Sequence, residues 1–295
     1  MRFRITSPKS FPPYLKIEPT PLCQLRCPGC VQSKPEVKKQ LNSGMFLSLE
    51  ALRKIIDPIS DYLFGVSLSL SGEPLLNRNI VNLIEYIHSK NIAVSFPTNL
   101  SIELNEENAE KVIRSGLDCL QVSLDGASKE SYVKYRVGGD FDLVVKNVKL
   151  LSNTKKALGL KHPILVWKYI VFEHNRHEVN MVIELYKTIG FDDYEFIYDN
   201  RSSVSKNTRT EFNKNLYENR KTCFWLWNTM IIRWNGDILP CCSVRDSWNI
   251  GNALTTNITE IWQSIKYESI REGFIKKHYG QKMHPACKSC IGLVN

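Results

Sequence analysis

The sequence predicts an α/β protein, in which a partial (β/α)6 barrel is followed by a small α+β domain with a β-hairpin. Two observations support this prediction. From Tyr14 to about Asp199, six short apolar strands alternate with helical segments, which is the pattern of a parallel sheet with crossover helices. Further along, Asn235-Gly236 lies between two apolar runs, and this dipeptide is a strong signal for a type I′ hairpin turn.

The elements follow from local patterns. The predicted barrel strands are Tyr14–Glu18, Val66–Ser71, Ala93–Pro97, Cys119–Leu124, Ile164–Phe172 and Tyr194–Tyr198, and the hairpin strands are Thr229–Trp234 and Asp237–Pro240. Asn79–Lys90 has the apolar spacing of an amphipathic helix. Asn105 and Asp140 are predicted N-caps of two further helices, and Gly116 and Gly190 are predicted to end helices.

Polar and apolar residues alternate along several strands, and this pattern indicates which face of each strand lines the barrel. Ser67 and Ser69 point to one side of the second strand, and Val66 and Leu68 to the other. The outer face of a parallel barrel lies under helices and must be apolar, so the polar side should face the lumen. We expect an open barrel suited to a polar ligand. The alternative, antiparallel strands with one solvated face, is disfavoured by the helices between the strands.

Three cysteines follow the first strand. Cys23, Cys27 and Cys30 have the spacing C-x₃-C-x₂-C, and thiolates this close suit an iron–sulfur cluster or zinc. A four-iron cluster usually takes four thiolates, so three would leave one iron open to an exogenous ligand. The alternative is a zinc site completed by a distant His or Cys, but zinc sites usually present paired C-x₂-C elements or Cys/His pairs.

On this triplet and its position after a strand, the sequence resembles the radical S-adenosylmethionine (SAM) enzymes, over roughly residues 14 to 199. The resemblance implies a TIM-like partial barrel whose [4Fe–4S] cluster, held by Cys23, Cys27 and Cys30, binds SAM. Reductive cleavage of SAM then yields a 5′-deoxyadenosyl radical that abstracts a hydrogen atom from the substrate. An external one-electron reductant of the flavodoxin or ferredoxin type is also implied.

The resemblance further implies SAM contacts at the carboxyl ends of the strands. Ser71-Gly72-Glu73-Pro74 stands where the family has a Gly-Gly-Glu-like motif, with a serine replacing the first glycine. Arg136 is a candidate fork for the SAM carboxylate, with a surface arginine as the alternative. The implied cofactor-binding residues are Gly72, Glu73, Asn99, Ser123 and Arg136.

A second cysteine set resembles the SPASM/twitch extension of radical SAM enzymes, which carries auxiliary clusters. The set lacks the C-x₂-C-x₅-C-x₃-C run of full SPASM domains, so it resembles the twitch form with one auxiliary [4Fe–4S] cluster. The implied ligands are Cys223, Cys241, Cys287 and Cys290, with Cys241 preferred to Cys242. A structural Cys₄ zinc ribbon is the alternative. The expected domains are a core at 1–200, a basic linker at 201–222 and the auxiliary domain at 223–295.

A cluster with four cysteine ligands suits an electron acceptor, because it cannot bind substrate through iron. The first functional hypothesis is therefore an oxidoreductase acting on a small polar molecule, such as a sugar or aminocyclitol. Its cysteine layout is similar to that of the twitch-type aminocyclitol dehydrogenases. The alternative is a maturase that modifies a ribosomally made peptide, although only 22 residues precede the triplet. The alternation of side chains along the strands places five charged residues toward the lumen. The candidates for catalysis among them are Lys168, Asp125 and Glu18, and the other two are Lys16 and Glu195.

Composition excludes several function classes. The formal charge of +9 favours a generally basic surface, and without an RNA-binding motif a nucleic-acid partner is not expected. The most apolar run, Ile164–Phe172, is too short to span a bilayer. Met1–Pro13 has no apolar signal-peptide region. A cytoplasmic location without membrane association is expected, and nine cysteines in a reducing compartment argue for metal ligation over disulfides.

Overall fold

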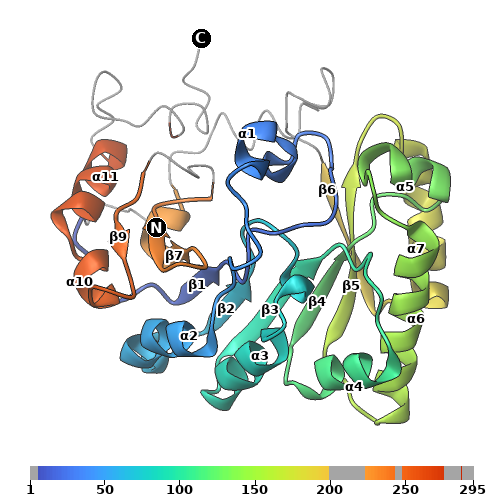
Figure 1. Ribbon diagram of the computed structural model, residues 1–295, viewed down its shortest axis with the longest axis horizontal. Coiled ribbons are helices and arrows are strands. Elements are labelled where there is room, and N and C mark those ends of the chain that lie inside the picture. The colour runs from blue at the N-terminus through green and yellow to red at the C-terminus, as the bar shows by residue number, and fades with distance from the viewer. Residues whose placement is uncertain (1–5, 199–222, 243–247, 276–286, 288–295) are drawn as a thin grey trace.

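The computed structural model describes residues 6–198, 223–242, 248–275 and 287 (Figure 1). Nine strands form one sheet in the order β6-β5-β4-β3-β2-β1-β7-β8-β9. The first six run parallel to their neighbours: β1 (Tyr14–Ile17), β2 (Gly65–Leu68), β3 (Ala93–Thr98), β4 (Cys119–Ser123), β5 (Ile164–Val171) and β6 (Asp193–Tyr198). Because β6 and β9 are the sheet edges, the barrel is open and partial, as the sequence predicted.

Helices cover the outer side of the parallel strands (Figure 1). They are α2 (Leu49–Ile56), α3 (Ile80–Ser89), α4 (Glu106–Arg114), α6 (Phe141–Ala157) and α7 (Val179–Ile189), while α1 (Pro35–Lys38) and α5 (Lys129–Tyr135) lie in loops on the carboxyl side. The predicted helix ends at Asn105 and Gly190 have the expected capping interactions. Asn105 Oδ1 accepts a hydrogen bond from the Asn108 amide at 2.8 Å, and Gly190 leaves the helix in the left-handed conformation at φ +115°.

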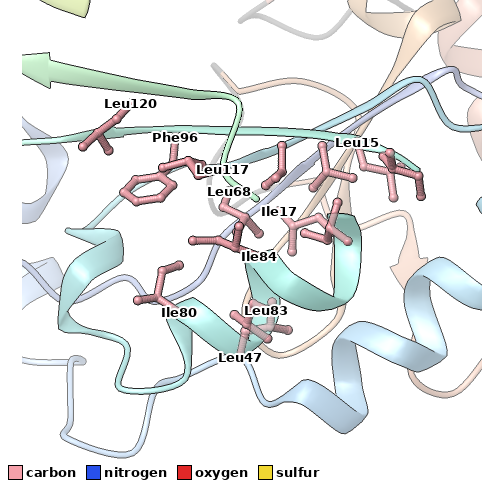
Figure 2. Close-up of a cluster of buried hydrophobic side chains, with 14 of the residues drawn as sticks. Leu15, Ile17, Leu47, Leu68, Ile80, Leu83, Ile84, Phe96, Leu117 and Leu120 are labelled. Atoms are coloured by element: carbon pink, nitrogen blue, oxygen red, sulfur yellow. The ribbon is translucent and has the colours of Figure 1, made fainter. Parts of the chain in front are cut away.

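The core lies between the strands and these helices. Leu15, Ile17, Leu68 and Phe96 of the strands belong to one buried cluster with side chains of α3 (Figure 2), and each is no more than 1% exposed. Burial of each such side chain stabilises the fold by about 1.5–3 kcal/mol. The opposite face of the parallel strands carries partly exposed polar residues, among them Ser67 on β2, Gln121 on β4 and Lys168 on β5. The predicted apolar-outside, polar-inside alternation is therefore confirmed.

The second cysteine region extends the same sheet. After α9 (Trp225–Asn228), strand β7 (Thr229–Ile232) pairs parallel with β1, and β8 (Asp237–Leu239) and β9 (Gly251–Asn252) continue antiparallel. Helices α10 (Ile258–Trp262) and α11 (Ile265–Ile275) pack at this end of the sheet (Figure 1). The expected boundaries at 200 and 222 fall outside the described residues, so the division into domains stays a prediction.

The predicted type I′ turn at Asn235-Gly236 is wrong. Only Gly236 has a positive φ, +87°, whereas type I′ requires positive φ at both central residues. Instead the Gly236 amide donates to the Arg233 carbonyl at 2.9 Å, and the Arg233 amide donates to the Asp237 carbonyl at 2.8 Å. This is a three-residue loop closed by a left-handed glycine. Asn235 Oδ1 accepts from the Asp237 amide at 3.2 Å, which stabilises the longer loop.

Described residues line two cavities on the lumen side. The larger, of about 520 Å³, occupies the amino-terminal half of the lumen, where Lys16, Ser67, Ser95 and Cys119 line it together with Trp225. The smaller is described with the candidate site. Within the described part of the chain, no helix combines the length and apolar character needed to cross a bilayer. The cytoplasmic location stays a prediction.

Candidate functional site

The cysteine triplet lies on the loop between β1 and α1, at the carboxyl end of the parallel sheet. The Cys30 amide donates to the Cys27 carbonyl at 3.1 Å, and the Arg26 amide donates to the Val137 carbonyl at 2.8 Å. Cys27 is 6% exposed, and Cys23 and Cys30 pack against the small apolar cluster to which it belongs. Burial raises the pKa of the Cys23 thiol to about 12 and that of the Cys27 thiol above its usual value.

The donor set fits an iron–sulfur cluster better than a single metal ion. Among the described residues, no group of three or more His, Cys, Asp or Glu side chains converges as a mononuclear metal site requires. A [4Fe–4S] cube bonds each thiolate to a different iron, so its ligands surround a volume and need not meet at one point. Three buried or partly buried cysteines on one loop, with N–H donors near two of the sulfurs, meet that requirement.

Gly72 brings the loop after β2 against the backbone that leads into Cys23. Its φ of +74° is left-handed, and the Glu73 amide donates to the Leu22 carbonyl at 2.7 Å. A Cβ at position 72 would overlap the Thr20 carbonyl oxygen and come within 2.6 Å of the Leu22 carbonyl oxygen. The glycine is therefore required by both the backbone conformation and the close approach.

Glu73 faces inward and is 1% exposed. Its carboxylate accepts hydrogen bonds from Thr98 Oγ1 at 2.7 Å and from the Asn99 amide at 2.6 Å. It also accepts one from the Leu75 amide at 3.1 Å. Desolvation by burial raises the pKa of Glu73, while these donors oppose that shift. The contacts indicate that Glu73 joins the β2 and β3 loops; direct contact with SAM stays a prediction.

Asn99 connects the end of β3 to the cysteine loop. Its Nδ2 lies 3.7 Å from Cys23 Sγ, a hydrogen-bonding distance for sulfur. Its Oδ1 accepts from Gln24 Nε2 at 2.9 Å and from the Ser101 amide at 2.9 Å. Sequence reasoning missed Gln24, whose position inside the cysteine triplet was the available signal. Together these amides hold the first cysteine of the triplet.

Arg136 approaches the second cysteine. Its Nε and Nη2 both donate to the same Asp125 oxygen, each at 2.7 Å. Its Nη1 lies 3.9 Å from Cys27 Sγ. The other Asp125 oxygen accepts from the Ile170 amide at 2.7 Å. The Asp125 charge raises the pKa of Arg136 although burial opposes that shift. This geometry joins Arg136 to Cys27 and leaves both Asp125 oxygens hydrogen-bonded; the fork for the SAM carboxylate stays a prediction.

The remaining catalytic candidates lie on the lumen side. Glu18, at the end of β1, is 2% exposed and accepts a hydrogen bond from Ser71 Oγ. Lys168 lies on β5 with its Nζ 3.4 Å from Gln121 Oε1, and its register partner on β4 is Ser123. Ser123 is partly exposed at the carboxyl end of β4. Of the three catalytic candidates, Glu18 alone borders the smaller cavity.

That smaller cavity, of about 100 Å³, lies where β1, β2 and β7 end. Polar groups of Glu18, Ser71 and Gln32 line it, and Arg233 and Trp234 border it from the hairpin. Gln32 is 8% exposed, and its Oε1 has no hydrogen-bond partner within the described ranges. An unsatisfied buried acceptor is costly, so this cavity suits a ligand that brings donors.

The second cysteine set is partly visible. Cys223 packs against the main core, and Cys241 follows β8. Burial raises the pKa of Tyr267 on α11, and thiolates at Cys241 and Cys223 would each raise it further. The structure describes Cys287, whereas Cys290 lies outside the described residues. The preference for Cys241 over Cys242 stays a prediction.

Family comparisons agree with this geometry. Residues 17–179, more than half of the chain, match the model of the Radical SAM superfamily. The chain belongs to the radical SAM superfamily. Residues 223–291 match the SPASM iron–sulfur cluster-binding domain. The two matches confirm SAM, a [4Fe–4S] cluster and auxiliary iron–sulfur binding as the cofactor chemistry of this radical SAM enzyme.

Individual relatives differ in their reactions. A GTP 3′,8-cyclase from Desulforamulus reducens is 31% identical over 177 residues, 60% of this chain and 52% of the relative. The chain thus matches about half the length of that curated relative. A cofactor-modifying protein for the tungsten-containing aldehyde ferredoxin oxidoreductase of Pyrococcus furiosus is 20% identical over 94% of this chain and 86% of its own.

Solved structures share the fold. Streptococcus suis SuiB bound to its precursor peptide SuiA superposes with a TM-score of 0.70 at 17% identity, over 96% of this chain and 70% of SuiB. At that identity the likeness establishes the fold alone. It confirms the predicted partial barrel.

Proposed function

We propose that this radical SAM enzyme is an oxidoreductase that removes two electrons from a small polar alcohol, such as a sugar or aminocyclitol. The observation that carries the proposal is the small cavity at the ends of β1, β2 and β7. A buried carboxylate, a hydroxyl and an unpartnered amide oxygen border it, and all three can accept hydrogen bonds. A substrate rich in O–H and N–H donors could bond to Gln32 Oε1 and add to the hydrogen bond that Glu18 already accepts from Ser71.

Different groups of the protein would serve the removal of the hydrogen atom, the proton and the electron from the alcohol. Bound to the Cys23–Cys30 loop, SAM and the [4Fe–4S] cluster would supply a carbon radical that takes one hydrogen atom from the alcohol carbon. Glu18 is the chain's candidate to accept the hydroxyl proton, because it borders the cavity and Asp125 is already bonded to Arg136 and Ile170. One electron then remains, and the second cysteine set would hold its acceptor. Loss of one hydrogen atom, one proton and one electron converts the alcohol to a carbonyl.

The test is substrate-dependent SAM cleavage. Anaerobically reconstituted protein is incubated with SAM, a flavodoxin- or ferredoxin-type reductant and a panel of polyols, sugars and aminocyclitols. We expect one panel member to stimulate 5′-deoxyadenosine release and to yield one carbonyl product per deoxyadenosine. The Cys27→Ala variant is the negative control. Stimulation by no member of the panel contradicts the proposed substrate class.

A second candidate is modification of a ribosomally made peptide. It is favoured by the fold shared with SuiB, which was solved with a precursor peptide. Peptides also present N–H donors, so the cavity chemistry does not exclude them. Stimulation of 5′-deoxyadenosine release by a peptide, with no response to the small-molecule panel, would favour this candidate.

A further inference from the structure

Two buried polar side chains on α11 are incompletely bonded. Tyr267 has no exposed surface, and its hydroxyl has no hydrogen-bond partner among the residues that the structure describes. Arg271 is also fully buried, and its Nη2 likewise has no partner there. Buried polar groups are nearly always hydrogen-bonded, so two exceptions one helical turn apart indicate that something polar is missing beside them.

The remainder of the Arg271 guanidinium is held firmly. Its Nε donates to the Leu226 carbonyl at 2.9 Å, and its Nη1 donates to the Trp262 carbonyl at 3.0 Å. Its Cζ lies 4.2 Å from the Trp262 ring centroid and 4.6 Å from that of Tyr267. None of the salt bridges between described residues includes Arg271. Glu268 acts electrostatically on the guanidinium, but no carboxylate of the described residues forms a salt bridge with it, which favours a further anionic group nearby.

The second cysteine set lies next to this pair. Leu226, which accepts from Arg271, comes three residues after Cys223. Cys223 packs against the same apolar cluster that contains Trp262 and Tyr267. Burial lowers the pKa of Arg271 to about 10, so the guanidinium stays charged at neutral pH. Burial raises the pKa of the Tyr267 hydroxyl, and thiolates at Cys241 and Cys223 would raise it further.

We propose that the Tyr267 hydroxyl donates a hydrogen bond to a sulfur of the auxiliary cluster, and that Arg271, stacked on the same ring, supplies the positive charge behind it. Tyr267 is then a positioning and tuning residue, because it touches the cluster's ligand shell and not the substrate. Hydrogen bonds and nearby positive charge stabilise the more reduced, more negative form of a cluster and raise its potential. The inference rests on the proposed function, since a higher potential is what an electron acceptor needs.

The experiment isolates the auxiliary cluster in the full chain. In the Cys23→Ala/Cys27→Ala/Cys30→Ala background, only the second set remains to bind a cluster, and about four irons per chain are expected. Tyr267→Phe is added to this background, and the reduction potential is measured by EPR-monitored titration. The phenyl ring keeps the contacts with Arg271 and Trp262, and the hydroxyl that is lost has no partner in the described residues. The variant should therefore fold.

We expect Tyr267→Phe to lower the potential so that the oxidised-to-reduced ratio at the parent's midpoint rises about tenfold, or about 59 mV for a one-electron couple. The matched control is Tyr169→Phe, which removes another buried tyrosine hydroxyl, bonded to the Asn175 carbonyl at 2.9 Å. It should leave the potential unchanged. An unchanged potential in Tyr267→Phe overturns the inference while the acceptor role stands. Absence of iron from the triple variant overturns both.

Should Tyr267→Phe fail to bind a cluster, the parent triple variant answers the same question. Electron–nuclear double resonance of its reduced cluster in H₂O and D₂O would reveal an exchangeable proton bonded to a cluster sulfur. A coupled exchangeable proton supports the inference, and its absence overturns it.

Discussion

Gly72→Ala tests whether the β2 loop must press against the backbone before Cys23. Two penalties add in this variant. Alanine at φ +74° costs about 1–2 kcal/mol in backbone conformation. Overlap of the new methyl group with the Thr20 and Leu22 carbonyl oxygens adds about 1–3 kcal/mol, because backbone must move. The expected loss of unfolding free energy is about 2–5 kcal/mol.

Gly159→Ala is the matched control. Gly159 has φ +65°, and nothing lies within 4 Å of the Cβ that alanine would add. It should pay only the conformational penalty of about 1–2 kcal/mol. Urea denaturation of the cluster-free variants measures the difference, and iron content after reconstitution measures the effect on the cysteine loop. We expect Gly72→Ala alone to lose iron from the first cluster. Equal destabilisation of the two variants, with full iron in both, would refute the close-packing argument.

Three further predictions concern other parts of the site. Cys241→Ser should remove about four of about eight irons, whereas Cys242→Ser should remove none. Iron and sulfide analysis measures both losses, and the opposite result would make Cys242 the cluster ligand. Arg136→Gln should lower the unfolding free energy by about 3–5 kcal/mol, because it leaves Asp125 buried with an uncompensated charge; a urea midpoint equal to that of the unaltered chain would argue against a buried pair. Glu18→Gln should keep SAM binding but lower product formation by about 10²–10⁴-fold, and undiminished turnover would exclude Glu18 as the proton acceptor.

The fold could be predicted because its signals are local. Strand polarity, the Asn105 cap and the left-handed Gly190 each depend on residues close in sequence, and the structure has all three. The hairpin loop differed because Asn235 bonds forward to Asp237, which a dipeptide rule does not include.

The site could be predicted only as far as its motifs extend. The cysteine spacing and Gly72 predict the SAM-binding loops from short stretches of sequence, and the structure brings these loops together. The direction of a side chain could not be predicted from these motifs, because it depends on partners distant along the chain. Glu73 turns toward β3, and Arg136 turns toward Asp125, because those groups complete their hydrogen bonds. Tyr267 carried no motif at all, and only its buried, unpartnered hydroxyl reveals it.

The most direct test of this account is SAM cleavage by the reduced, anaerobically reconstituted protein, compared with the Cys23→Ala/Cys27→Ala/Cys30→Ala variant. We expect 5′-deoxyadenosine from the unaltered chain, with about eight irons bound, and none from the variant, with about four. Zinc in place of iron at the triplet, or equal deoxyadenosine from both proteins, would contradict it.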